Sequence, residues 1–387
     1  MKSVYKLISL FTLFSIVSCS GGTLELKNKA VTHETKFGGI YIDETIEDFN
    51  KLGFKFGDSV DVTFSNGYKQ LDLPYYNGYY VDNLKPLLVG YPGYPFIKTC
   101  INNGNDMWEL GNLKEGDTAT IKLNKKGKYL DIQEAMDIHY TDEQGDIPDE
   151  VFGNFRVVNL ANLKNNILYR GASPVDNQHK RAPVVDRLLG TKVNTIINLS
   201  DNDQEITEHI AKPDFNSPNF HRIYENGNVI ALSMNMNFQS SLSGQEKEEV
   251  TGLFTEFKNA DFTAKLIRGL RFMIAHEGPY MVHCVEGKDR TGFVMMVLET
   301  LAGATYNQII DDYMITYDNY YGINKTKDLN KYNVIKGKNI DVMLSTLIGD
   351  SSVDITTANY ANECEEYLRA GGLSASEITQ LKARLLK

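Results

Sequence analysis

The amino-acid sequence predicts an α/β domain with a central, mostly parallel sheet over residues 154–387, preceded by a small β-rich, barrel-like domain over residues 38–141. Two observations carry this prediction. In the first half, apolar and polar residues alternate in short runs that are typical of half-buried strands. In the second half, short apolar runs are interleaved with apolar residues at helical spacing, the order expected of an α/β fold. A chain of 387 residues has room for two such domains.

The start of the chain, residues 1–19, resembles the signal peptide of a bacterial lipoprotein. Two lysines precede an eleven-residue, mostly apolar run from Leu7 to Val17, which is too short for a permanent membrane helix but typical of a secretory signal. The run leads into a motif similar to a lipobox, in which Cys19 is lipidated. Plain secretion with an incidental Cys19 is the alternative. We expect an exported protein, held by lipid on the outside of the cytoplasmic membrane or at the cell surface.

Composition narrows the classes of function. The net charge is −10, and becomes −12 without residues 1–19, which argues against nucleic-acid binding by bulk electrostatics. Four cysteines in this length exclude a disulfide-scaffolded fold, and a pairing of Cys100 with Cys364 stays open. The histidines show no metal-ligand spacing, so we expect neither a metal nor another cofactor.

The barrel-like domain is predicted from an internal sequence repeat. Residues 57–64 and 116–123 share a Gly-Asp turn followed by an alternating strand, and they lie 59 positions apart. This repeat suggests a small barrel with approximate two-fold symmetry. Residues 88–123 also resemble, weakly, the C-terminal barrel of the S-adenosylmethionine hydroxide adenosyltransferases, which implies a barrel-like shape only.

Two segments are expected to lie outside the folded domains. Residues 20–37 are polar and aperiodic and are interpreted as a tether. Residues 142–153 begin with an acidic stretch that contains Gly and Pro, which is typical of a linker.

In the α/β domain, buried strands are predicted at residues 195–199 and 279–282. Helical spacing is present at residues 250–257 and 266–274. Residues 293–301 are apolar nearly all round, which predicts a helix that is buried on every side.

The main chemical signal is the segment His283–Gly292, with the skeleton H-C-x5-R-T-G. We call its residues 284–290 the signature loop. Five residues between Cys284 and Arg290 can curl so that successive backbone N–H groups point at one anion, and Gly287 permits backbone angles that other residues resist. The predicted helix that follows adds the positive end of its dipole.

This arrangement is suited to phosphoryl transfer. Cys284, as a thiolate in a positive field, is the expected nucleophile and would carry the phosphoryl group. Arg290 offers a planar fork for two phosphate oxygens, and Thr291 could hydrogen-bond Cys284 and help it leave. The residues expected to bind phosphate are Val285, Glu286, Gly287, Lys288, Asp289 and Arg290.

The signature loop resembles that of the protein tyrosine phosphatase superfamily, and Gly287–Gly292 is similar to bacterial secreted tyrosine/serine and phosphoinositide phosphatases. Asn154–Arg156 and Leu168–Gly171 are similar to the entry segments of that branch, and residues 301–313 and 367–381 to its later helices. The resemblance covers residues 154–387 and implies a metal-independent phosphatase.

The sequence also departs from this pattern. It has no Trp-Pro-Asp motif, and Val157–Leu160 stands where the branch often has a Gly-Gly pair, so the general acid stays open. Asp289 is favoured, because the resemblance implies an acid at this place; the alternative is that it orients Arg290. Asp201 and Asp203 follow a predicted strand and are the secondary candidates.

The expected function is hydrolysis of phosphomonoesters. Phosphotyrosine in proteins is the first substrate and phosphoinositides or inositol phosphates are the second, since Lys288 adds positive charge beside the loop. A non-catalytic surface module that binds phosphate is the alternative of another class. Nucleic acid is not expected as a partner, the membrane is contacted only through the lipid anchor, and the oligomeric state stays open.

Overall fold

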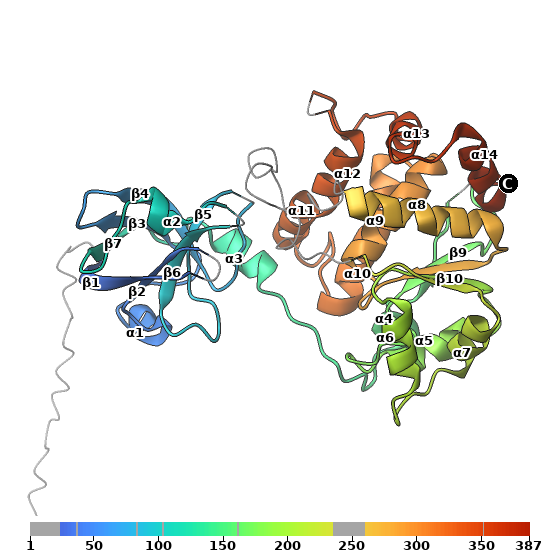
Figure 1. Cartoon of the computed structure of the whole chain (residues 1–387), viewed down its shortest axis with the longest axis horizontal. Helices are drawn as coiled ribbons and strands as arrows, with labels where there is room; N and C mark the ends of the chain where they lie inside the picture. Colours follow the sequence, from blue (N-terminus) through green and yellow to red (C-terminus); the bar gives the residue numbers. More distant parts are fainter. Residues whose placement is uncertain are drawn as a thin grey trace, which may run out of the picture.

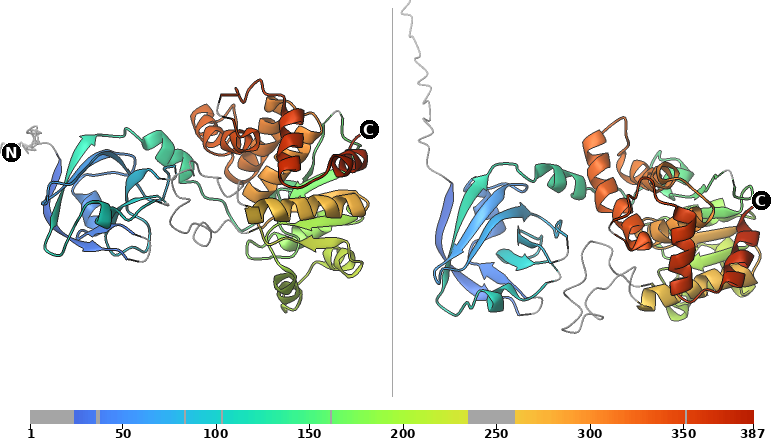
Figure 2. Two further views of the ribbon diagram at one scale, coloured as in Figure 1. Left: turned by 45° about the horizontal axis from the view of Figure 1, so that its top comes forward. Right: turned by 90° about the horizontal axis from the view of Figure 1, so that it is seen from above.

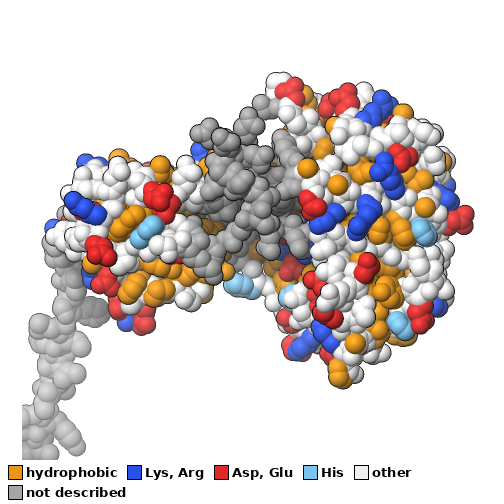
Figure 3. Space-filling view, in the orientation of Figure 1, with side chains coloured by type: hydrophobic (Ala, Val, Ile, Leu, Met, Phe, Trp, Pro, Cys, Tyr) orange, Lys and Arg blue, Asp and Glu red, His pale blue; other side chains and the backbone are white. Residues whose placement is uncertain are grey.

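The computed structural model describes residues 24–35, 38–82, 84–102, 104–160, 162–234, 260–350 and 352–387. The signal-peptide prediction with Cys19, and the helical spacing at residues 250–257, lie outside the described residues. Figure 1 shows a smaller β-rich domain and a larger α/β domain side by side. On the face drawn in Figure 3, acidic and basic side chains are interspersed over both domains. None of the described helices is both long and apolar enough to span a bilayer.

The predicted barrel is confirmed as a closed barrel with the strand order β1-β2-β6-β5-β4-β3-β7. Two short helices, α1 (Ile46–Lys51) and α2 (Met107–Leu110), accompany it. The strands are β1 (Glu25–His33), β2 (Ile40–Ile42), β3 (Ser59–Phe64), β4 (Lys69–Tyr76), β5 (Pro86–Val89), β6 (Ile97–Ile101) and β7 (Thr118–Lys125).

The first strand corrects the predicted tether over residues 20–37. β1 pairs with β2 on one side and with β7 on the other, so it closes the barrel. Its pairing with β7 shifts register between Leu26 and Lys29, where Asn28 has a positive φ of 52°. Such a bulge breaks the alternation of inward and outward residues, which is why the sequence shows no strand pattern there.

The two copies of the internal repeat form a pair of neighbouring strands. β3 and β7 are antiparallel neighbours, and Val62 lies opposite Ile121, its own counterpart in the repeat 59 positions later. A local two-fold axis therefore passes through this pair. The turns that precede the two strands also match, since Gly57 and Gly116 both have a φ of +90°.

The larger domain has a five-stranded sheet with the order β11-β10-β12-β9-β8. Neighbours from β11 to β9 are parallel, whereas β8 pairs with β9 in the antiparallel direction, so the sheet is mixed and the predicted parallel arrangement holds for four of the five strands. The strands are β8 (Arg156–Val157), β9 (Leu168–Gly171), β10 (Thr195–Asn198), β11 (Val229–Ala231) and β12 (Tyr280–His283).

Helices cover both faces of this sheet (Figure 1). One face packs against α5 (Ala182–Leu189), α6 (Asp203–Ile210) and α7 (Pro218–Glu225). The other packs against a larger helical layer, built from α8 (Ala260–Ala275), α9 (Asp289–Leu301), α10 (Tyr306–Tyr321), α11 (Leu329–Lys338), α12 (Ile340–Ile348), α13 (Tyr360–Ala370) and α14 (Ala375–Leu385). The buried helix predicted at residues 293–301 is confirmed as part of α9, in which every residue from Thr291 to Leu301 is buried.

The connection between the domains is structured. Helix α3 (Leu130–Met136) packs against α11, and Figure 2 shows it between the barrel and the helical layer. Within the predicted linker, residues 149–152 form α4 (Asp149–Phe152), which packs against α5. The sequence of this linker is polar enough for a free connection, but Asp142, Glu143 and Asp149 form ion pairs with basic residues of the larger domain.

Candidate active site

The signature loop connects the end of β12 to the start of α9. His283, the last residue of β12, is in register with Asn198 of β10 and with Gly171 of β9. Because these parallel strands end together, the segments that follow them meet at one edge of the sheet. The side chain of Cys284 is 3% exposed, directly after the central strand.

The carbonyl groups of the loop are bonded outward to the surrounding protein. The carbonyl oxygen of Cys284 accepts a hydrogen bond from His283 Nδ1 at 3.2 Å. The carbonyl oxygen of Val285 accepts from the backbone N–H of Ser173 at 3.0 Å. The next two carbonyls are bonded in the same way: Glu286 O accepts from Tyr320 Oη at 2.6 Å, and Gly287 O accepts from Arg170 Nη2 at 3.0 Å. Asn154 Nδ2 lies 3.3 Å from each of these last two oxygens.

This pattern fixes the direction of the amides. In a planar trans peptide the N–H points opposite to the C=O of the same unit. Four successive carbonyls that point outward therefore turn the N–H groups of residues 285–288 toward the inside of the loop. Within the part of the chain that the structure describes, none of these amides donates a hydrogen bond to a protein acceptor. The loop is thus a concave set of donors that matches an anion.

Gly287 is required by the close approach of two backbones. Its φ is +69°, and a Cβ at this position would lie 2.2 Å from the carbonyl oxygen of Gly171. No side chain fits in that space. The positive φ agrees with the backbone angles that the sequence argument expected here, and the structure adds that the loop lies directly against the end of β9.

A buried network of ion pairs is hydrogen-bonded to the backbone of the loop. Arg170 is 1% exposed, and its Nη1 lies 2.5 Å from Asp312 Oδ2 while its Nη2 binds the loop. Arg156 Nε binds the same carboxylate at 2.9 Å. Burial opposes ionisation, but the two guanidinium groups hold the pKa of Asp312 well below its usual range. Burial and the adjacent Asp312 charge raise the pKa of Glu299 well above its usual range.

Sequence reasoning did not assign a role to these supporting residues. Asn154, Arg170 and Asp312 lie in segments that were recognised only for their resemblance, and Tyr320 carried no signal. They are 114 to 130 positions away from the loop or belong to a different helix, so only the folded chain brings them together.

Lys288 is held among acidic and aromatic groups. Its Nζ lies 3.0 Å from Glu286 Oε2, 3.8 Å from Asp289 Oδ2 and 3.4 Å from the hydroxyl of Tyr321. Burial alone would lower the pKa of Lys288, but the Asp289 and Glu286 carboxylates raise it well above its usual range. The ammonium therefore remains charged, and its charge is matched by neighbouring acids.

The candidate general acids differ in environment. Burial raises the pKa of Asp289, against the opposing charges of Lys288 and Arg290, and a raised pKa suits a proton donor. Asp201 Oδ2 accepts hydrogen bonds from Asn198 Nδ2 at 2.8 Å and from Ser200 Oγ at 3.1 Å.

Asp203 is exposed at the start of α6, and among the described residues no hydrogen bond or ion pair joins its side chain to the loop. Asp289 thus belongs to the loop itself, Asp201 is bonded beside the neighbouring strand, and Asp203 is exposed.

Three further side chains complete the site. The Nδ1–H of His283 donates to a carbonyl, and burial lowers the pKa of this histidine to about 4, so the ring is neutral. Arg290 Nη1 lies 3.4 Å from the carbonyl oxygen of Met234. The expected hydrogen bond between Thr291 and Cys284 is not formed, since Thr291 Oγ1 is buried without a hydrogen-bond partner among the described residues.

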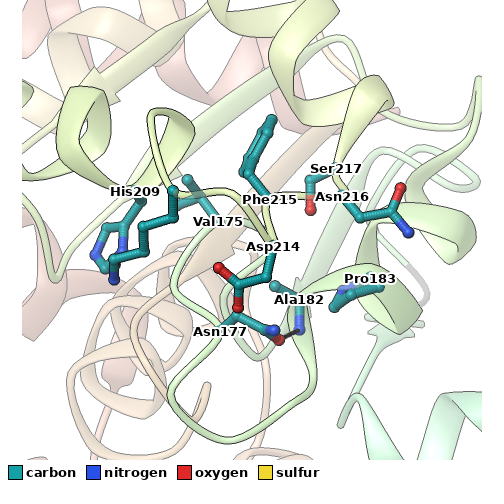
Figure 4. A pocket seen from close by; sticks show the side chains of 10 residues that line it. Val175, Asn177, Ala182, Pro183, His209, Asp214, Phe215, Asn216 and Ser217 are labelled. Carbon is teal, nitrogen blue, oxygen red and sulfur yellow. Dashed lines mark hydrogen bonds between the residues drawn. The ribbon is translucent and has the colours of Figure 1, made fainter.

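Among the described residues, one group of side chains has the spacing of metal ligands. Atoms of Asp176, Asp201 and His209 lie within 4.8 Å of one another. Lys212 Nζ donates to His209 Nδ1 at 2.9 Å, which leaves the ring proton on Nε2, facing Asp201. His209 therefore has a partner on both ring nitrogens, Lys212 at 2.9 Å and Asp201 Oδ1 at 3.7 Å. His209 and Lys212 also line a small hollow against α5, drawn in Figure 4.

Comparison with known families agrees with this geometry. A model described as the tyrosine phosphatase family matches residues 152–387, which include all of the loop and its supporting network. No curated protein matches the chain.

Proposed function

The chain belongs to the tyrosine phosphatase family, and from this premise we propose that it is an exported phosphatase that hydrolyses phosphotyrosine in proteins through a cysteinyl-phosphate intermediate. Family membership makes it a phosphoric monoester hydrolase. The substrate, the covalent mechanism and export are the proposed parts.

One observation carries the covalent mechanism. The four outward carbonyls of residues 284–287 turn the following amides toward the space beside Cys284. Donors fixed in this way stabilise the charge of a phosphoryl group in the transition state without reorganising at the moment of reaction. Cys284, the first residue of the signature loop, is the nucleophilic side chain next to these amides.

The proposed reaction has two steps. In the first, the Cys284 thiolate attacks phosphorus, the P–O bond to the tyrosine oxygen breaks, and Asp289 gives its proton to that oxygen. In the second, Asp289 takes a proton from water, the hydroxide oxygen bonds to phosphorus, and the S–P bond breaks to regenerate the thiolate and release phosphate. Arg290 donates hydrogen bonds to two oxygens of the phosphoryl group in both steps.

The charge balance around Lys288 favours a substrate with a single phosphate. Its ammonium is already paired with the Glu286 carboxylate at 3.0 Å, so the loop offers little surplus positive charge to a second phosphate group. This weighs against the expectation, drawn from the sequence, that Lys288 selects inositol phosphates.

A substrate panel tests the proposal. Phosphotyrosine peptides, a soluble phosphoinositide and an aryl phosphate are compared in kcat/KM, with and without a chelator of divalent metals. We expect the phosphotyrosine peptide to be preferred and the chelator to have no effect. Preference for the phosphoinositide transfers the proposal to the second substrate class, and absence of turnover on all three supports the non-catalytic module.

Export and anchoring at Cys19 rest on the sequence motif alone. Cys19→Ala in the full chain should move the protein from the membrane fraction to the soluble fraction or block its processing. Unchanged partitioning into detergent would count against lipidation.

A further inference from the structure

The segment that follows the barrel contacts the signature loop, although it precedes residues 152–387, the part of the chain that matches the family. Helix α3 contributes Ala135 to the hydrophobic core of the larger domain, and Ile138 packs against the same core. On its other side, Ile132 of this helix packs against the barrel, and Gln133 Nε2 binds Asn77 Oδ1 at 2.7 Å. The helix is therefore shared by both domains, and it delivers the next residues to a defined place.

Tyr140 lies at that place. Its hydroxyl donates a hydrogen bond to Glu286 Oε1, in the middle of the signature loop, at 2.6 Å. Its ring stacks on Tyr320 with 5.1 Å between the centroids, and Tyr321 lies 5.7 Å away. The guanidinium of Arg181, which belongs to the family domain, lies 4.6 Å from the centroid of the Tyr140 ring.

The residues that follow Tyr140 are fastened as well. Arg181 is 3% exposed, its Nη2 donates to the carbonyl oxygen of Thr141 at 2.8 Å, and its Nη1 lies 3.0 Å from Asp142 Oδ1. A buried guanidinium with charge-assisted bonds of this length is a strong restraint. The tyrosine is thus fixed from both directions along the chain.

Glu286 joins this segment to the rest of the loop. One carboxylate oxygen accepts from Tyr140, and the other lies 3.0 Å from Lys288 Nζ. Burial would raise the pKa of Glu286, but Lys288 and the Tyr140 hydroxyl lower it, while burial and the carboxylate raise the pKa of Tyr140. The pair therefore consists of a protonated donor and an ionised acceptor.

We propose that Tyr140 is a positioning residue for the signature loop, so that the catalytic unit extends beyond the family domain into the segment supplied by the barrel. Its hydroxyl fixes the Glu286 side chain, and with it the peptide whose N–H points into the loop and the ammonium of Lys288. This inference rests on the proposed function, because it concerns how the same loop binds phosphate.

The test uses Tyr140→Phe in the full chain, which removes only the hydroxyl and keeps the stacked ring. Hydrogen bonds to charged groups are stronger than neutral ones, and we expect kcat/KM for an aryl phosphate to fall about tenfold. The inhibition constant of inorganic phosphate should rise by a similar factor, while the dependence of rate on the leaving group stays unchanged. A substitution that only lowered the folded fraction would leave the inhibition constant of inorganic phosphate unchanged.

A matched control exists in the same domain. Tyr306 donates its hydroxyl to Asp341 Oδ1 at 2.7 Å, and Lys336 Nζ lies 2.7 Å from Asp341 Oδ2, the same triad of groups placed away from the loop. Tyr306→Phe should change kcat/KM less than twofold. In a Glu286→Ala background, Tyr140→Phe should have no further effect, because its partner is already gone.

The outcomes separate this inference from the proposed function. If the wild-type chain turns over phosphomonoesters and Tyr140→Phe leaves both constants within twofold, the positioning role is wrong. If the wild-type chain has no activity, the proposed function fails, and protection of Cys284 from alkylation by inorganic phosphate decides the inference instead. Weaker protection in Tyr140→Phe than in Tyr306→Phe supports it, and equal protection overturns it.

Discussion

Gly287→Ala is the substitution whose effect follows most directly from the geometry of the loop. An alanine at a φ of +69° costs about 1–2 kcal/mol of folding free energy. Its Cβ would also lie 2.2 Å from the carbonyl oxygen of Gly171, so one of the two backbones must move by about 1 Å to reach an ordinary contact. That movement pulls the Gly287 carbonyl from Arg170 and turns the inward amides away.

The expected loss in kcat is at least about 100-fold, since a single displaced oxyanion donor typically costs that much. Gly349→Ala is the matched control: Gly349 has a φ of +74° at the end of α12, and nothing lies within 4 Å of an added Cβ. Both variants should lose stability in chemical denaturation, Gly287→Ala the more because its added Cβ clashes with Gly171, but only Gly287→Ala should lose activity in a nitrophenyl phosphate assay. A folded Gly287→Ala protein with kcat within tenfold of the wild type would refute the reasoning.

Two further predictions concern titrating groups. Asp289→Asn should reduce kcat strongly for a phosphotyrosine peptide and much less for nitrophenyl phosphate, whose leaving group needs no proton; equal losses in the two assays would argue against the acid role. Hydrogen bonds from Arg271 and Ser374 lower the pKa of Glu377 to about 2, below its ordinary value of 4.5, so this carboxylate stabilises the fold above pH 4.5 and that contribution is lost as the pH falls toward 2. Glu377→Gln should therefore flatten the decline of the unfolding free energy over that window, and an unchanged slope would contradict the argument.

The parts of the site that are contiguous in sequence were predictable. The spacing of Cys284 and Arg290, with a strand before and a helix after, indicated a loop that binds an anion, and Gly287 indicated its backbone conformation. The repeat at residues 57–64 and 116–123 likewise predicted two strands that the barrel pairs with each other. In each case local sequence determines the feature.

The support of the loop could not be predicted in the same way. Arg170 and Tyr320 act through single hydrogen bonds to backbone carbonyls, and those contacts leave no spacing or periodicity in the sequence. β1 was assigned to the tether because a bulge removes its alternation. Tyr140 was missed because it precedes every segment that resembles the phosphatases and reaches the loop only through the packing of α3.

The central claim is that Cys284 carries the phosphoryl group during turnover. The most direct measurement is the stoichiometry of phosphate bound to the Cys284 peptide after rapid mixing of the full chain with an aryl phosphate labelled in its phosphoryl group and immediate denaturation. We expect a label on this cysteine that approaches one per chain, and a Cys284→Ser variant that is unlabelled and inactive but still binds inorganic phosphate. Wild-type turnover without label on Cys284, or near-normal turnover by Cys284→Ser, would contradict it.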